Sequence, residues 1–237
     1  MNRNVAEKII FAACLLVLMV CVCKEAQSQS IIKTNYPKMA PLEQYLMERN
    51  AEIALARSAA PPAISKDAEV LVLGQHSYES AVKGTNGFVC MVQRSWTVDA
   101  NHPDFWNPKL RSPTCFNAPA VRSNLPIILR RTELILEGKS KEQMFESIRS
   151  AFDKKELPLP EPDSMCYMMS SQGYLNDEAA GPWLPHVMIF VPLIDPKAWG
   201  ANNPGSPIFA FQDVDNHFTV FMIPVSKWSD GTLAPTK

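Results

Sequence analysis

The sequence contains none of the short motifs that mark the common catalytic mechanisms. It has no G-x-S-x-G nucleophile elbow, no H-E-x-x-H zinc motif, no C-x-x-C pair, no P-loop and no G-x-G-x-x-G dinucleotide loop. Its most glycine-rich stretch, GTNG at 84–87, predicts a turn, since Asn-Gly accepts positive φ at both positions. No named reaction is therefore indicated by a motif, and we expect no cofactor.

An excess of charge of one sign is also missing. The 237 residues carry 23 Lys and Arg against 24 Asp and Glu, a formal net charge of −1 at pH 7. No basic stripe is present that could neutralise phosphates, and we therefore expect no nucleic-acid partner. Glycine is scarce as well, with nine residues against 20 prolines, and this predicts many fixed, irregular connections.

The first 28 residues have the pattern of an export signal. Arg3 and Lys8 give a basic start, residues 9–23 form an uncharged apolar run, and Ala26-Gln27-Ser28 supplies small residues where a signal peptidase reads. The run is shorter than the roughly 20 apolar residues that span a bilayer. We therefore expect cleavage after Ser28 and no transmembrane span afterwards, with an uncleaved anchor as the alternative.

Two cysteines of the signal segment raise the possibility of a lipid anchor. Cys21 and Cys23 follow Met19-Val20 and Cys21-Val22, which are poor small-residue lead-ins for lipidation. The sequence thus favours a free periplasmic or secreted protein over a lipid-anchored one. The segment has a net charge of +1, so the remaining chain carries −2.

Three cysteines, Cys90, Cys115 and Cys166, remain in what should be an oxidising compartment. Cys90 lies in the second arm of the hairpin predicted around GTNG, and Cys115 ends the irregular segment that follows. We predict a disulfide between these two. Cys166 is a competing partner, but its methionine and tyrosine neighbours favour a packed thiol.

The remaining chain predicts one α+β domain at 42–237, after an N-terminal tether at 29–41. The architecture expected is a single mainly antiparallel sheet with an N-terminal helix and an inserted helical hairpin. No helical pattern separates the last strands, so antiparallel pairing is the default. The expected elements are a helix at 42–60, a strand at 68–74, a β-hairpin at 77–94, an irregular loop at 96–124, two helices at 125–138 and 140–154, and strands at 165–171, 186–193, 207–213 and 218–225.

One histidine stands at the start of the most apolar run after the signal, WLPHVMIFVP at 183–192. Strand alternation places His186, Met188 and Phe190 on one face. A histidine there needs hydrogen-bond partners, and a buried structural histidine is the favoured interpretation. A catalytic role for His186 is the alternative, because perturbed histidines cluster at functional sites.

A second polar cluster, FQDVDNHF, places Asp213, Asp215 and His217 at alternating positions. On one face of an extended segment, these groups could hold a divalent ion or orient a general base. The same letters describe a polar turn, with Asp215-Asn216 as turn residues, and we favour the turn because the spacing matches no specific metal motif. His217 is also a catalytic candidate beside His186.

The irregular segment and its start carry four further candidates. Arg94, Trp96, His102 and Trp106 could line a binding pocket, because exposed aromatic side chains on a loop suggest recognition. Packing of the loop onto the domain is an equal alternative.

Four stretches together resemble a family of exported bacterial proteins of unassigned function. They are ALARSAAPPAISKDAEVLVL (54–73), GTNGFVCMVQRSW (84–96), LPIILRRTELILEGKS (125–140) and WLPHVMIFVP (183–192). The resemblance spans residues 42–228 and implies export without implying a reaction.

The sequence therefore favours an exported domain that binds a small molecule or an envelope component, or has a structural role there. The alternative is a hydrolase-like or metal-assisted enzyme that uses His186 with Asp213, Asp215 or His217.

Overall fold

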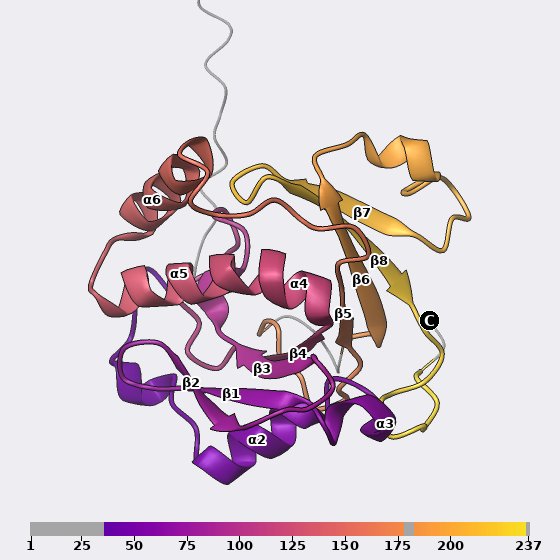
Figure 1. Ribbon diagram of the computed structural model, residues 1–237, viewed down its shortest axis with the longest axis horizontal. Coiled ribbons are helices and arrows are strands. Elements are labelled where there is room, and N and C mark those ends of the chain that lie inside the picture. Colours follow the sequence, from indigo (N-terminus) through magenta and orange to yellow (C-terminus); the bar gives the residue numbers. More distant parts are fainter. Residues whose placement is uncertain (1–35, 178–182, 236–237) are drawn as a thin grey trace, which may run out of the picture. The chain divides into compact units, whose positions relative to one another are not determined.

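A computed structural model describes residues 36–177 and 183–235, and in these ranges eight strands form one sheet in the order β2-β1-β3-β4-β5-β6-β8-β7 (Figure 1). The pair β1–β3 is parallel and every other pair is antiparallel. The strands are β1 (Glu69–Leu73), β2 (Tyr78–Val82), β3 (Val89–Gln93), β4 (Ser112–Phe116), β5 (Met165–Met168), β6 (His186–Pro192), β7 (Phe209–Asp213) and β8 (Phe218–Pro224). The α+β class and the mainly antiparallel sheet are confirmed. The predicted signal at 1–28 and the first part of the tether lie outside the described residues.

The hairpin predicted around GTNG is wrong, because β2 and β3 are not neighbours. β1 lies between them, antiparallel to β2 and parallel to β3. The GTNG segment instead crosses the start of β1, where Thr85 N–H donates to the Asp67 carbonyl and the Asn86 amide to the Ile64 carbonyl. The Asn-Gly signal identified the bend correctly, but β2 and β3 each pair with β1 and not with each other.

The loop expected at 96–124 contains a central strand and a short helix. β4 pairs along its whole length with β3, and only Cys115 and Phe116 pair with β5. Pro113 therefore lies beyond the end of β5, where a missing N–H does not interrupt a ladder on both sides. The helix α4 (Ala118–Ser123) follows, capped by the Asn117 side chain, which accepts from Ala120 N–H.

The N-terminal helix is shorter than expected. Residues 42–60 contain a 3-10 turn, Leu42–Gln44, and then α2 (Arg49–Arg57), and a one-turn helix α3 (Pro62–Ser65) follows. The carboxylate of Glu48 accepts from the N–H groups of Asn50 and Ala51, so it caps α2 at a position where the pattern predicted continuous helix.

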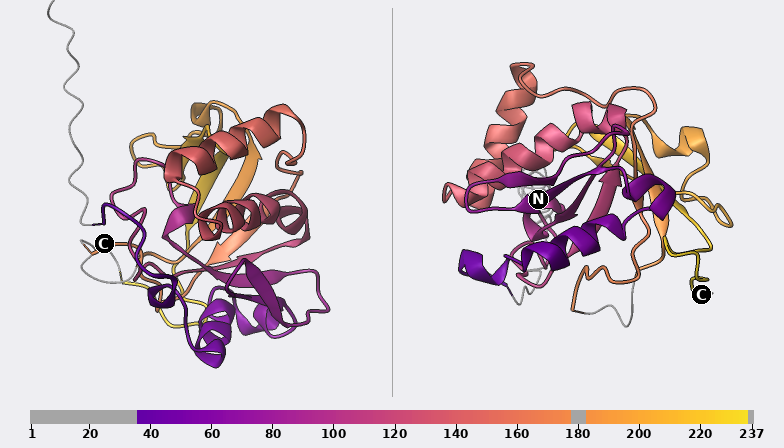
Figure 2. Two further views of the ribbon diagram at one scale, coloured as in Figure 1. Left: turned by 90° about the vertical axis from the view of Figure 1, so that its left-hand side faces the viewer. Right: turned by 60° about the horizontal axis from the view of Figure 1, so that its bottom comes forward.

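The inserted helical hairpin is present as α5 (Leu125–Leu136) and α6 (Lys141–Asp153). Ser140 and Gln143 form the capping box that the sequence predicts at the start of α6. Two views agree that α4 and α5 lie on one side of strands β1 and β3 and α2 on the other (Figures 1 and 2). Each face of the sheet consequently has its own apolar cluster, a larger one under α5 and α6 and a smaller one under α2.

Cys90 and Cys115 stand directly opposite each other in the β3–β4 ladder, on the α2 face, at disulfide distance. Cys166 on β5 is buried and unpaired. The predicted cysteine pairing is thus the one that the fold brings together. In the described ranges, no helix has the length and apolar character that a membrane crossing requires.

Candidate functional site

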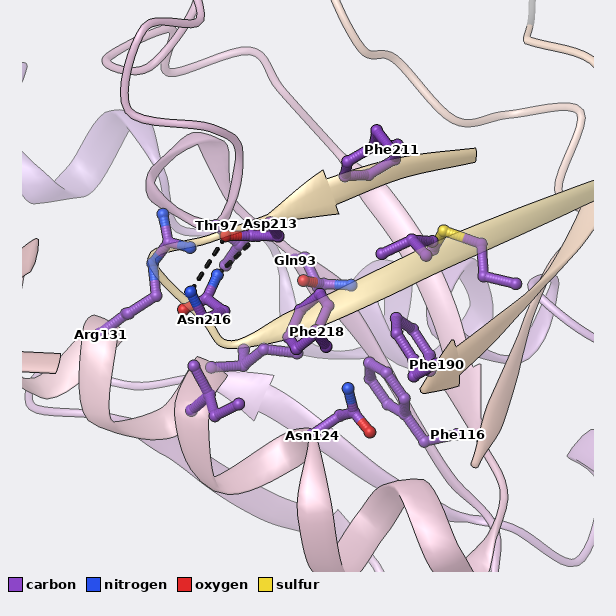
Figure 3. Close-up of a pocket in the computed structure, with 14 residues that line it drawn as sticks. Gln93, Thr97, Phe116, Asn124, Arg131, Phe190, Phe211, Asp213, Asn216 and Phe218 are labelled. Carbon is purple, nitrogen blue, oxygen red and sulfur yellow. Dashed lines mark hydrogen bonds between the residues drawn. The ribbon is translucent and has the colours of Figure 1, made fainter. Parts of the chain in front are cut away.

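A pocket of about 120 Å³ opens between α5 and the half of the sheet formed by β6, β8 and β7 (Figure 3). This volume is smaller than the range of about 300–1,000 Å³ found for sites that hold drug-sized molecules, so the pocket fits a small ligand or one end of a larger one. Its walls come from segments far apart in the sequence: Gln93, Thr97, Phe116, Asn124, Ile127, Ile128, Arg131, Met188, Phe190, Phe211, Asp213, Asn216, Phe218 and Val220.

The sheet side of the pocket is aromatic. Phe190, Val220 and Phe211 lie in one row across β6, β8 and β7, because Phe190 pairs with Val220 and Val220 with Phe211. Phe218 lies two residues before Val220 and therefore shares its face. Phe190 and Phe218 meet edge to face, with ring centroids 5.6 Å apart. Phe211 is 46% exposed on the edge strand. The pocket therefore offers aromatic faces to a flat apolar molecule.

Arg131 is the one charged side chain that α5 contributes. It is only 2% exposed, its Nη2 donates to the Val98 carbonyl at 2.6 Å, and its guanidinium carbon lies 4.8 Å from the centre of the Phe145 ring. Its Nε has no hydrogen-bond partner among the described residues, and no carboxylate there forms an ion pair with it. Burial lowers the pKa of Arg131 to about 10. The charges of Asp213, Asp215 and Asp99 oppose that fall without forming a direct ion pair, and a buried charge without such a pair is costly.

Asp213 and Asn216 face Arg131 from the end of β7 and the β7–β8 turn. The Asp213 carboxylate accepts from the backbone N–H of Asn216 at 3.1 Å and from its Nδ2 at 2.7 Å. Burial raises the pKa of Asp213, while the bonds from Asn216 and the charge of Arg131 oppose that rise. Because Nδ2 of Asn216 points to Asp213, its Oδ1 is the free end of the amide, and this buried oxygen has no partner within the described chain.

Asn124, at the junction of α4 and α5, adds a third unpaired polar atom. Its Oδ1 accepts from the Ser123 hydroxyl at 3.0 Å, which leaves the buried Nδ2 without a partner in the described ranges. In the view of Figure 3, Arg131, Asp213 and Asn216 gather at one side of the pocket, and Phe116, Phe190 and Asn124 lie away from them. The pocket thus combines an apolar floor with separated polar groups.

His186 does not join this site. It is half-buried at the start of β6, its Nδ1 lies 2.8 Å from the Leu184 carbonyl, and its ring meets that of Trp183 at a centroid distance of 5.8 Å. Burial lowers the pKa of His186. In the β6–β8 ladder it pairs with Pro224, whereas Phe218, next to His217, pairs with Pro192. Six residues at about 3.3 Å each separate these ends by about 20 Å. His186 therefore does not share a cleft with His217, as the enzyme hypothesis requires.

The side chains of Asp213, Asp215 and His217 do not converge on one point. Asp213 contacts Asn216, Asp215 forms an ion pair with Arg149 at 2.9 Å, and His217 stacks on Phe152 with ring centroids 4.5 Å apart. Residues 214–217 form the β7–β8 turn, and His217 has a φ of 58°. Among the residues that the structure describes, no group of three His, Cys, Asp or Glu side chains could hold a metal ion.

Arg94 and Trp96 are core residues and do not line the pocket. Arg94 is fully buried and donates to Glu52 at 2.8 Å and to the Tyr45 carbonyl at 2.8 Å. Trp96 is also fully buried, and its Nε1 donates to the Thr132 hydroxyl at 2.9 Å. Their neighbours Gln93 and Thr97 are the residues of this segment that reach the pocket.

His102 and Trp106 belong to a loop that packs onto the domain. The Nδ1 of His102 accepts from Asp104 N–H at 3.1 Å, and the Trp106 ring meets Phe105 edge-on at 4.6 Å. The Tyr45 hydroxyl donates to the Trp106 carbonyl at 2.8 Å. The packing alternative for the loop therefore describes both residues, and neither lines the pocket.

Of the residues singled out from the sequence, Asp213 alone lines this pocket. Arg131 had a readable signal, since it shares one helix face with Ile127, four residues before it, and Leu134, three residues after it. An arginine within an apolar stripe indicates a buried charge, which is often functional. Asn124 and Asn216 had no comparable signal, because asparagine is expected in any turn or cap.

Compared with known proteins, the chain matches no protein-family model, no curated protein and no solved structure. Its resemblance to exported bacterial proteins accordingly stays a prediction, and the geometry of the pocket is what bears on function.

Proposed function

We propose that this protein is an exported binding protein whose pocket between α5 and the sheet holds a small molecule with a flat apolar body and a polar end. One observation carries the proposal. Of the five buried side-chain atoms that lack a hydrogen-bond partner in the described residues, three belong to residues that line this pocket: Asn124 Nδ2, Arg131 Nε and Asn216 Oδ1. Each such atom costs about 1–3 kcal/mol, and a ligand that pairs with them recovers this cost.

The aromatic floor supports the same function. Stacked and edge-on contacts with aromatic rings are worth about 0.5–1.5 kcal/mol each beyond the burial of area. A molecule that enters past Phe211 meets Phe190 and Phe218 below it and Arg131 at its end. The arrangement selects for shape and polarity, and among the described residues that line it no nucleophile is placed beside a base, which favours binding over catalysis.

Export rests on the signal pattern of residues 1–28, and a cysteine pair at disulfide distance supports it, because such bonds persist in oxidising compartments. N-terminal sequencing of the protein from the cells that make it should begin at Gln29. A mature protein that begins at Met1 would contradict export.

Binding is tested with N-phenyl-1-naphthylamine, a neutral dye whose fluorescence rises in apolar surroundings. We expect saturable binding of one dye per protein. Ile128→Trp places a larger side chain in the pocket and should abolish the signal. Leu136→Trp is the matched control, since Leu136 is also half-buried on α5 but does not line the pocket. Unsaturable binding, or equal binding by both variants, would refute the proposal, provided that circular dichroism shows both to be folded.

A further inference from the structure

The polar end of the pocket combines the Arg131 guanidinium, one of whose nitrogens has no hydrogen-bond partner, with two kinds of acceptor. Arg131 Nε is a donor without a partner, and Asn216 Oδ1 is an acceptor without one. The Asp213 carboxylate also lines the pocket, and its carboxylate oxygens accept from Asn216. The orientation of Asn216 is set by its Nδ2, which donates to Asp213 at 2.7 Å, so that Oδ1 cannot exchange places with a donor without breaking that bond.

From this pattern we infer that the ligand ends in an uncharged amide or lactam group, and that Arg131 and Asn216 read its two polar atoms. The inference rests on the proposed binding function and adds the chemical class of the ligand. The amide carbonyl accepts from Arg131 Nε, and the amide N–H donates to Asn216 Oδ1.

Three other end groups fit less well. A carboxylate has acceptors only, so it would pair with Arg131 but meet the Asp213 carboxylate and Asn216 Oδ1 with like charge or lone pairs. An ammonium group has donors only and would meet the Arg131 guanidinium. A hydroxyl group must donate and accept through a single oxygen, whereas an amide presents the two functions on separate atoms, as the protein does.

The test compares three naphthalene probes of similar shape at pH 8, well above the usual range of carboxyl pKa values. They are 2-naphthamide, 2-naphthoate and 2-methylnaphthalene, measured by displacement of N-phenyl-1-naphthylamine. Because a hydrogen bond to a charged group such as the Arg131 guanidinium is worth about 1.5–3 kcal/mol, we expect the amide to bind at least about tenfold more tightly than either of the others.

Asp213→Asn removes the charge that disfavours a carboxylate. In this variant the preference for 2-naphthamide over 2-naphthoate should shrink by about tenfold. Asp215→Asn is the matched control, since it makes the same chemical change two residues further along, on a side chain that pairs with Arg149 and does not line the pocket. It should leave the preference unchanged.

The possible outcomes distinguish a wrong ligand class from a wrong binding function. If 2-naphthoate or 2-methylnaphthalene binds as tightly as the amide, the ligand class is wrong while the pocket remains a binding site. An equal loss of preference in the two aspartate variants would also overturn it. If no probe displaces the dye, or the dye itself does not bind, both proposals fail. The comparison of probes on the unmodified protein decides the matter even if Asp213→Asn does not fold.

Discussion

The buried ion pair between Glu52 on α2 and Arg94 after β3 offers the sharpest test of how this fold is held together. The two side chains are 1% and 0% exposed and lie 2.8 Å apart. Glu52 Oε1 also accepts from Leu73 N–H at 3.1 Å, and Arg94 donates to the carbonyls of Tyr45 and Val92. Loss of one partner leaves the other charge buried without compensation, which costs about 3–5 kcal/mol. Glu52→Met should therefore destabilise the protein by about that amount.

The double variant Glu52→Met/Arg94→Met should be more stable than the single one, because no uncompensated charge remains. The Val92 carbonyl keeps its bond from the Tyr78 hydroxyl at 2.9 Å. The Tyr45 carbonyl and the Leu73 N–H lose theirs, and an unpaired buried group costs about 1–3 kcal/mol. We expect the second substitution to recover part of the stability lost with the first.

Urea unfolding followed by tryptophan fluorescence measures the free energy of unfolding of the single and the double variant, and thermal unfolding gives their Tm. For a chain of this size, about 3–5 kcal/mol corresponds to a fall in Tm of roughly 6–20 °C. Glu161→Met is the control: Glu161 and Arg122 lie 2.6 Å apart but are 37% and 57% exposed, so their loss should leave stability unchanged within error. A double variant less stable than the single one, or a Glu52→Met variant as stable as the control, would refute the reasoning.

Three further predictions concern the cysteines and the titratable groups. Cys90→Ala/Cys115→Ala should lose about 3.5 kcal/mol of unfolding free energy, the value of the loop-entropy relation for a separation of 25 residues. In the unmodified, unreduced protein, only Cys166 should be alkylated, and only after unfolding. Label on all three thiols would contradict the pairing. Burial raises the native pKa of Asp213 above the unfolded value of about 3.9, so the native state holds that proton more tightly. Wild type should therefore lose stability relative to Asp213→Asn as pH rises from about 4 through the raised pKa. An equal dependence of the unfolding free energy on pH in the two proteins, measured by urea unfolding, would count against this. Burial lowers the native pKa of His186 below about 6.5, so the unfolded state binds that proton more tightly. Wild type should therefore lose stability relative to His186→Gln as pH falls below about 6.5. Parallel curves of unfolding free energy against pH for the two proteins would contradict this.

Local patterns in the sequence determined the elements whose signals are short in range. The capping box at Ser140, the helical periodicity of α5 and α6 and the apolar alternation of the last three strands each depend on residues within a few positions. Antiparallel pairing of those strands followed because no helical pattern, which a parallel crossover usually contains, separates them. The pairing of Cys90 with Cys115 was also within reach, although the hairpin that suggested it is wrong.

Only the tertiary structure decided which strands are neighbours and which side chains meet. The place of β1 between β2 and β3 depends on burial of both its faces, under α2 and under α5, and no turn signal encodes that. The pocket likewise draws Asn124, Arg131, Asp213 and Asn216 from segments about 90 residues apart along the chain. Sequence reasoning grouped Asp213 with His217 because they are neighbours in the chain. The turn directs His217 to Phe152 and Asp213 into the pocket, since side chains that follow each other in a turn point to different partners.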